Sequence, residues 1–99
     1  MNAMTTKLVA ADGREFECQL IEAANPSNRM PCIYAGLLGN GVEIGAVRFL
    51  FPVVQILSVR FDWPQLFLQA IRQIGEQHWV EIILQQPGVV HESTFNPSA

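Results

Sequence analysis

Two glutamates, Glu15 and Glu17, stand one residue apart in a stretch where polar and apolar residues alternate. Residues i and i+2 of a β-strand project from the same face, so the two carboxylates would lie side by side. Paired carboxylates can bind a hard cation, but no third ligand follows at a suitable spacing. Alternating acids are typical of a strand face in water, and we expect neither a metal site nor a bound cofactor.

Two histidines, His78 and His91, are the residues that could serve as general bases. Neither lies in a His-x-x-x-His or Cys-His arrangement, so no nucleophile–base pair is indicated. His78 falls in the last turn of a predicted helix, where the helix dipole favours a cation. The glycines at positions 36, 39 and 41 lack the spacing and the lysine of a phosphate-binding loop, and a turn explains them. The sequence therefore predicts no catalytic residue.

The two cysteines, Cys18 and Cys32, are too few for a disulfide framework or a four-ligand zinc site. If the strands around them form a hairpin closed by residues 23–28, Cys18 falls opposite Cys32 or Ile33. Two buried free thiols are the expected state in the cytoplasm. A redox pair of neighbouring thiols is the alternative hypothesis.

A helix over Asp62–His78 is the element with the clearest pattern, because apolar residues recur at the i, i+3, i+4 spacing that lines one side of a helix. Asp62 can accept the amide hydrogen of Gln65 as an N-cap, and Pro64 stands in the first turn, where its missing N–H costs nothing. The apolar stripe consists of Trp63, Leu66, Phe67, Ala70, Ile71 and Ile74, and the polar side of Gln65, Gln69, Arg72, Gln73, Glu76 and Gln77.

The chain before the helix predicts an antiparallel meander. Asp12-Gly13 favours a hairpin turn between a short strand, Lys7–Ala11, and an alternating strand over residues 15–20. Further strands are expected over Met30–Leu37, over Val42–Leu50 with a bulge near Arg48 where the alternation slips, and over Val53–Arg60.

Gly75 leaves two interpretations open for the chain that follows the helix. It could end the helix as a left-handed cap, and Trp79–Leu84 would then form a strand of β-branched residues. Alternatively the helix continues to about Gln85, because the apolar stripe continues. We favour a helix that ends near His78 with a strand after it.

The length of 99 residues fits one domain, which we expect to span residues 4–92. Residues 1–3 are interpreted as a cloning remnant or an alternative start and are left out of the fold. Residues 93–99 are expected to form a flexible tail.

The charge pattern excludes several classes of partner. The formal net charge is −3, and the six Lys and Arg residues are scattered singly, whereas nucleic-acid binding needs a clustered basic surface. The chain has no basic tail for an anionic membrane and no run of about 18 apolar residues for a membrane-spanning helix. The N-terminus lacks the basic-then-apolar pattern of a signal peptide, so we expect a cytoplasmic protein.

Hydrophobic residues make up 49% of the chain and charged residues 15%, which is apolar for so small a domain. Either a second copy or a partner covers part of this surface, which we favour, or strands are buried on both faces. The surplus is concentrated between residues 49 and 59, and a homodimer or a partner groove would cover it unless the C-terminal segment does so. The predicted partner-binding residues are Phe49, Phe51, Val53 and Val54, with Glu15, Glu17 and Glu43 as acidic contacts.

The helix segment carries a resemblance. Its residues 61–70, Phe-Asp-Trp-Pro-Gln-Leu-Phe-Leu-Gln-Ala, and the later pair Ile74-Gly75 follow a predicted meander. This block, about a fifth of the chain, resembles the helix of short bacterial proteins of unknown function. In those proteins an apolar residue and an Asp precede a Gln-apolar-apolar run that ends in an apolar-Gly pair. The long apolar segment over residues 49–59 departs from that pattern. The resemblance implies a β-meander followed by one amphipathic helix, and no activity.

Together these patterns predict an α+β domain: an antiparallel β-meander of four to five strands, one amphipathic helix (about 62–78) packed on one face, and room for an extra C-terminal strand. The predicted function is binding of another protein without catalysis, as immunity proteins, inhibitors and accessory subunits do. The alternative is a small-ligand-binding protein or enzyme with a site between sheet and helix. Its residues would come from Tyr34, Glu43, Arg48 and His78.

Overall fold

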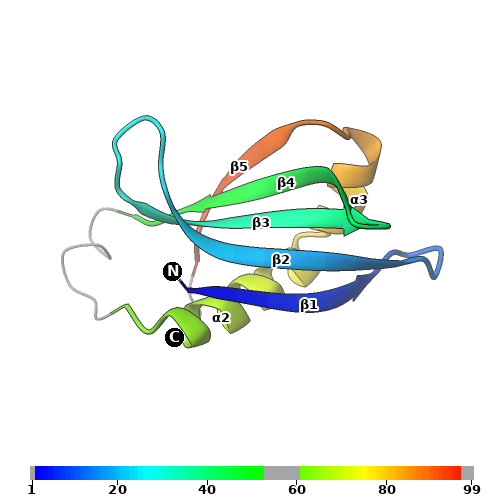
Figure 1. Cartoon of the computed structure of the whole chain (residues 1–99), viewed down its shortest axis with the longest axis horizontal. Helices are drawn as coiled ribbons and strands as arrows, with labels where there is room; N and C mark the ends of the chain where they lie inside the picture. Colours follow the sequence, from blue (N-terminus) through cyan, green and yellow to red (C-terminus); the bar gives the residue numbers. More distant parts are fainter. Residues whose placement is uncertain (1, 53–60, 97–99) are drawn as a thin grey trace.

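The computed structural model describes residues 2–52 and 61–96, and the expected strand Val53–Arg60 lies outside these residues. The described chain forms a five-stranded sheet and two helices (Figure 1). The strands are β1 (Ala3–Val9), β2 (Glu15–Ala24), β3 (Pro31–Gly39), β4 (Val42–Leu50) and β5 (Val90–Thr94), and the helices are α2 (Trp63–Glu76) and α3 (Trp79–Gln85).

The strand order in the sheet is β1-β2-β3-β4-β5. The first four strands form an antiparallel meander, whereas β5 joins β4 in parallel. Gly13 (φ 90°) follows Asp12 in the first hairpin turn, and Asn40-Gly41, with φ of 53° and 78°, forms the tight turn between β3 and β4. The α+β class, the meander and a C-terminal strand are therefore confirmed.

Several strands begin or end at residues other than those expected. β1 begins at Ala3, and Asn2 accepts a hydrogen bond from the backbone N–H of Glu22, so residues left out of the predicted fold belong to the edge of the sheet. β2 continues to Ala24, which shortens the loop expected over residues 23–28. β5 extends to Thr94, into the segment expected to be a tail.

The predicted bulge near Arg48 was wrong. Arg48 pairs regularly with Tyr34, whereas the register shifts where Leu37 pairs with Gly45 and Leu38 pairs with Glu43. Ile44 is therefore the extra residue of β4. A one-residue shift moves every later side chain to the other face of the sheet, so this bulge decides which face Glu43 occupies.

Helix α2 begins as its sequence indicates. The Asp62 Oδ1 atom accepts a hydrogen bond from the Gln65 N–H at 3.4 Å, and proline occupies the first turn. Of the predicted stripe, Leu66, Phe67, Ala70 and Ile74 are buried, and Trp63 and Ile71 are partly buried. These side chains pack against one face of the sheet.

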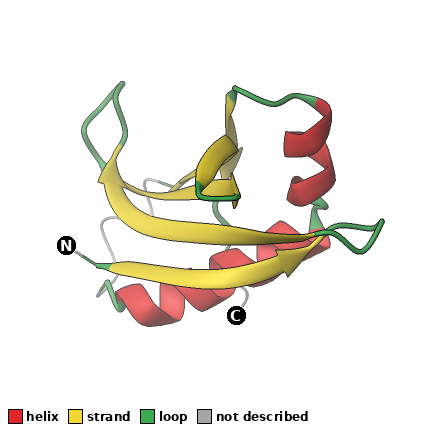
Figure 2. Cartoon of the chain, turned by 45° about the vertical axis from the view of Figure 1, so that its right-hand side comes forward, coloured by secondary structure: helices red, strands yellow, loops and turns green. Residues whose placement is uncertain are grey.

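The chain after α2 forms a second helix, so the favoured strand over Trp79–Leu84 was wrong. His78 has a left-handed conformation (φ 57°) and separates α2 from α3, a role that one interpretation had assigned to Gly75. The turn at His78 redirects the apolar stripe, and Val80 and Ile83 of α3 pack into the same core as α2. Figure 2 shows α2 running beneath the sheet and α3 standing at one end.

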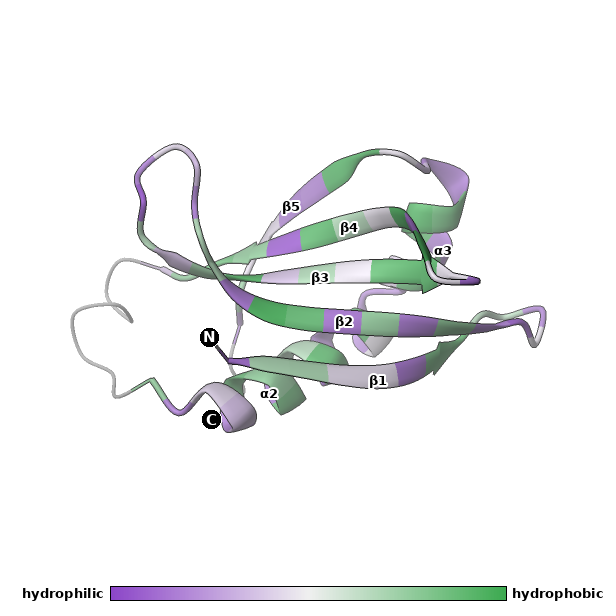
Figure 3. Ribbon diagram, in the orientation of Figure 1, coloured by the Kyte–Doolittle hydropathy of each residue, from purple (hydrophilic) through white to green (hydrophobic). Residues whose placement is uncertain are grey.

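The core lies between the helices and one face of the sheet. Along β2, hydrophobic residues that face this core alternate with hydrophilic residues that face away (Figure 3). The central strands contribute residues buried on both faces: Ile33 and Val47 face the helices, whereas Cys32 and Ala46 lie on the opposite face, and none is more than 1% exposed. Burial on both faces therefore accounts for part of the apolar surplus within one chain.

Gln73 was expected on the polar side of α2 but is only 4% exposed. Its Nε2 donates to the backbone oxygen of Thr94 at 2.8 Å, and its Oε1 accepts from the backbone N–H of Asn96 at 2.8 Å. A side-chain amide thus pairs with the last residue of β5 and with Asn96 beyond it, as a neighbouring strand would. This pairing satisfies backbone groups that would otherwise lose hydrogen bonds at the sheet edge.

Candidate functional site: the open face of the sheet

The open face is the side of the sheet opposite to the two helices. The strand register aligns its side chains in rows that cross β1, β2, β3, β4 and β5. Among the described residues, this face carries four carboxylates and two cations, so it is acidic. Its charged and aromatic side chains are Lys7, Glu15, Glu17, Tyr34, Glu43, Arg48 and Glu92.

Tyr34 and Arg48 are neighbours across β3 and β4, and each is held by a carboxylate. The Tyr34 hydroxyl donates to Glu43 Oε2 at 3.1 Å, and Arg48 Nη1 donates to Glu92 Oε2 at 2.9 Å. The Arg48 guanidinium also lies 6.0 Å from the centre of the Tyr34 ring, at the outer limit of a cation–π contact. An aromatic ring and a guanidinium are therefore fixed side by side on the sheet.

The surroundings of Tyr34 keep its hydroxyl protonated. Burial raises the pKa of Tyr34, and the hydrogen bond to Glu43 and the charge of that carboxylate raise it further. The phenol is therefore a hydrogen-bond donor and not a general base at neutral pH.

The position of Glu43 depends on two neighbours. The bulge at Ile44 turns Glu43 to the open face, opposite Leu38. Gly36 leaves room for the carboxylate, because a Cβ atom at position 36 would collide with Glu43 Oε1. The carboxylate can therefore lie flat over β3 and reach the Tyr34 hydroxyl.

Glu15 and Glu17 lie on β2, toward the β1 edge of the open face. Lys7 is paired with Glu17 in the strand register and its Nζ lies 4.0 Å from Glu15 Oε1, while both side chains are largely exposed. An exposed pair of this kind contributes about 0–1 kcal/mol to stability. The described residues contain no group of three or more metal-ligating side chains.

The described apolar residues that were predicted to contact a partner do not lie on the open face with the predicted acids. Phe49 is 0% exposed and Phe51 is 7% exposed, so both belong to the core and neither is available to a partner. Val53 and Val54 lie outside the described residues. Of the predicted set, the described residues that are exposed are Glu15, Glu17 and Glu43, and they share the open face.

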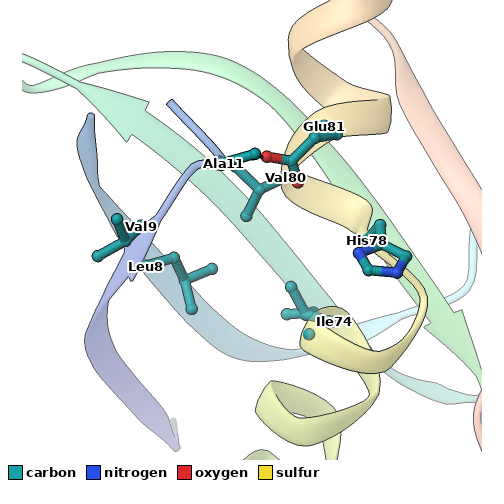
Figure 4. A pocket seen from close by; sticks show the side chains of 8 residues that line it. Leu8, Val9, Ala11, Ile74, His78, Val80 and Glu81 are labelled. Carbon is teal, nitrogen blue, oxygen red and sulfur yellow. Dashed lines mark hydrogen bonds between the residues drawn. The ribbon is translucent and has the colours of Figure 1, made fainter. Parts of the chain in front are cut away.

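A cavity of about 290 Å³ lies between the end of β1 and the junction of α2 with α3 (Figure 4). Its walls are mainly apolar, and Glu81, one of its two titratable residues, accepts the Ala11 N–H at 2.7 Å. Of the four residues named for a ligand site between sheet and helix, only His78 lines this cavity. Tyr34, Glu43 and Arg48 do come together, but on the opposite face of the sheet.

The two thiols are not neighbours. Cys18 pairs with Leu37 and faces the core, whereas Cys32 pairs with Ala23 and lies on the open-face side. The expected register of this hairpin was wrong because its loop is centred later in the chain than predicted. Both cysteines are free and buried, and burial raises the pKa of Cys18 to about 12.

We predict that neither thiol reacts readily in the folded protein. A thiol of raised pKa stays protonated at pH 8, and the thiolate is the reactive form. Titration with a thiol reagent at pH 8 should therefore find slow reaction in buffer and two rapidly reacting groups in denaturant. Fast stoichiometric reaction of Cys18 in buffer would contradict the burial that raises its pKa.

Sequence reasoning missed two features of this face. The pairing of Arg48 with Glu92 joins residues 44 positions apart and requires the parallel strand β5. No local pattern signals a parallel partner for a short strand. The contact of Tyr34 with Glu43 could have been expected from the sequence, because the two residues stand on either side of the Asn40-Gly41 hairpin turn.

Comparisons with protein-family models, with curated proteins and with solved structures found no match. The resemblance of the helix to short bacterial proteins therefore stays a prediction. None of the described helices has the length and apolar character needed to cross a bilayer.

Proposed function

We propose that this protein binds another protein through the open face of its sheet and performs no catalysis, as immunity proteins, inhibitors and accessory subunits do. The observation that carries the proposal is the pair Tyr34–Arg48, held in place by Glu43 and Glu92 on a face away from both helices. Tyrosine and arginine are the residue types enriched among the energetically dominant contacts of protein interfaces.

The arrangement of Tyr34 and Arg48 is suited to binding because their side chains are already ordered before a partner binds. The Arg48 side chain is 18% exposed and its guanidinium is already held by Glu92, so its rotamer freedom is lost on folding and not on association. The backbone beneath these groups belongs to the central strands of the sheet. A rigid aromatic and a rigid cation can thus contact a partner at low entropic cost.

The charge of the open face favours a partner with a basic surface. Glu15, Glu17 and Glu43 are exposed, and among the described residues Glu17 has no ion-pair partner within 4.0 Å. Complementary charge raises the association rate and selects the partner more than it raises affinity. The two free cysteines fit a reducing compartment, which supports a cytoplasmic location.

The test is a single charge reversal with a matched control. The protein is immobilised, the proteins that it retains from a bacterial lysate are identified, and association rates are measured for the retained protein of highest basic charge. Glu17→Lys should lower the association rate about fivefold at low salt, because it reverses a charge that steers the partner. The difference should shrink at high salt, where the charges are screened.

Glu76→Lys is the control, since it makes the same charge change on α2, on the other side of the sheet. Its association rate should equal that of the unmodified protein within twofold. Equal rates for Glu17→Lys and the unmodified protein at low salt, or an equal decrease in both variants, would reject the open face as the binding surface.

A further inference from the structure

Among residues 2–52 and 61–96, strand β1 is an end strand of the sheet, and one row of its backbone groups has no strand partner there. The Glu22 N–H donates to the Asn2 oxygen, and the Ala10 N–H donates to the Arg14 oxygen, so even-numbered residues of this strand bond to β2. Backbone groups alternate in direction along a strand, and those of Ala3, Thr5, Lys7 and Val9 therefore point away from the sheet.

This edge has few of the features by which proteins protect an exposed strand. β1 pairs with β2 over seven residues without a bulge, contains no proline and carries one charge, Lys7. Long, regular and weakly charged edges are the ones that pair with another chain.

The apolar side of the edge is also incompletely covered. Leu8 and Val9 point to opposite faces of the sheet, yet both line the cavity of about 290 Å³, so this cavity lies at the edge of the strand (Figure 4). Ile74 and Val80 form its far wall. Met4 and Leu8 are only partly buried against the core. Another strand beside β1 would place its own apolar side chains against these residues.

We propose that β1 pairs antiparallel with β1 of a second copy of this chain, about a two-fold axis at Thr6. Each residue then faces one of the second copy such that the two residue numbers add to twelve. Hydrogen bonds between the two strands must join odd-numbered residues of one copy to odd-numbered residues of the other, because only these have outward-pointing backbone groups. The sum is therefore an even number. Twelve is the sum that pairs all seven residues, Ala3–Val9.

The side chains favour the same register. It places Lys7 opposite Thr5 of the second copy, whereas a sum of fourteen would put the two Lys7 ammonium groups directly opposite each other, which is destabilising. Met4 of the second copy lies opposite Leu8, at the mouth of the cavity. An antiparallel strand is self-complementary under two-fold symmetry, so the same two contacts form twice. The pairing leaves the open face exposed and does not depend on the proposed function.

The first test is the mass in solution by light scattering across a tenfold dilution, for the full chain and for two variants. The unmodified chain should have twice the monomer mass of 11.0 kDa. Thr5→Pro should be monomeric, because it removes an outward N–H while the hydrogen bonds to β2 remain. Thr5→Val keeps that N–H and should remain dimeric. A monomer at every concentration, or a Thr5→Pro dimer as stable as the unmodified one, would overturn the proposal.

The second test fixes the register and does not depend on the fold tolerating proline. Thr6 faces itself across the proposed axis as a non-hydrogen-bonded pair, whose Cα separation of about 4.5 Å suits a disulfide. Thr6→Cys should therefore form a covalent dimer on mild oxidation, in a Cys18→Ala background because Cys18 is its neighbour on β2. Lys7→Cys in the same background should cross-link far less. Preferential cross-linking of Lys7→Cys, or none at either position, would refute this pairing in favour of another register or a foreign strand.

Discussion

Replacing Gln73 with leucine should lower the free energy of unfolding by about 2–3 kcal/mol, although leucine has a similar size and a higher hydrophobicity. The amide of Gln73 satisfies the Thr94 oxygen and the Asn96 N–H, both at 2.8 Å. Leucine would leave both backbone groups unpaired beside a buried side chain, and each such loss costs about 1–3 kcal/mol. Urea denaturation followed by fluorescence of the two tryptophans measures the change.

The control is Gln65→Leu, which makes the same replacement at an exposed position of the same helix. Its unfolding free energy should change by less than about 0.5 kcal/mol. Amide hydrogen exchange should show the largest loss of protection in β5 for Gln73→Leu. Equal stabilities of the two variants would mean that Gln73 does not hold the end of this strand.

Phe49→Ala should lower the free energy of unfolding by about 4 kcal/mol, the cost of removing a buried aromatic ring and leaving a cavity. Phe49 is 0% exposed, and its ring lies edge-on to Phe95 at 6.2 Å, which in turn contacts Phe51 at 5.1 Å. These three rings join β4 to the C-terminal end of β5. Thermal unfolding should show the loss as a large decrease in the midpoint.

Leu68→Ala removes an apolar side chain that is 54% exposed and should cost less than about 1 kcal/mol. The comparison also separates two roles for Phe49. A core residue destabilises the fold when truncated, whereas a partner-binding residue would leave stability intact and weaken association alone. If Phe49→Ala lowers the free energy of unfolding by less than about 1 kcal/mol, Phe49 would be a partner contact and not a core residue.

The parts of the fold that could be predicted are those set by neighbouring residues. Asp62 caps α2, and the Asp12-Gly13 and Asn40-Gly41 turns set the hairpins, because each depends on the chemistry of a few adjacent residues. The Trp79–Gln85 segment is a helix but was predicted to be a strand, because its β-branched residues favour a strand locally. Packing of Val80 and Ile83 into the core overrides that preference.

The candidate site was less predictable because it depends on register and on distant pairing. Periodicity placed Gln73 on the polar side of α2, yet the strand end beside it supplies two polar partners, so a polar side chain is buried there. The face occupied by Glu43 depends on a bulge at Ile44. No residue type in that stretch predicts this bulge. The acids of the open face could be named from the sequence, but their arrangement around Tyr34 and Arg48 could not.

The parallel pairing of β5 with β4 has a consequence for the order in which the chain folds. The three hairpins of the meander join strands that are adjacent in sequence, so each closes a short loop at a small entropic cost. Arg48 and Glu92, by contrast, lie 44 positions apart. Pairing of their strands closes a much longer stretch of chain, which costs more entropy than closing a hairpin. Strand β4 therefore gains its partner β5 only after the C-terminal half has been synthesised, and until then the apolar side of the meander has neither α2 nor α3 to cover it.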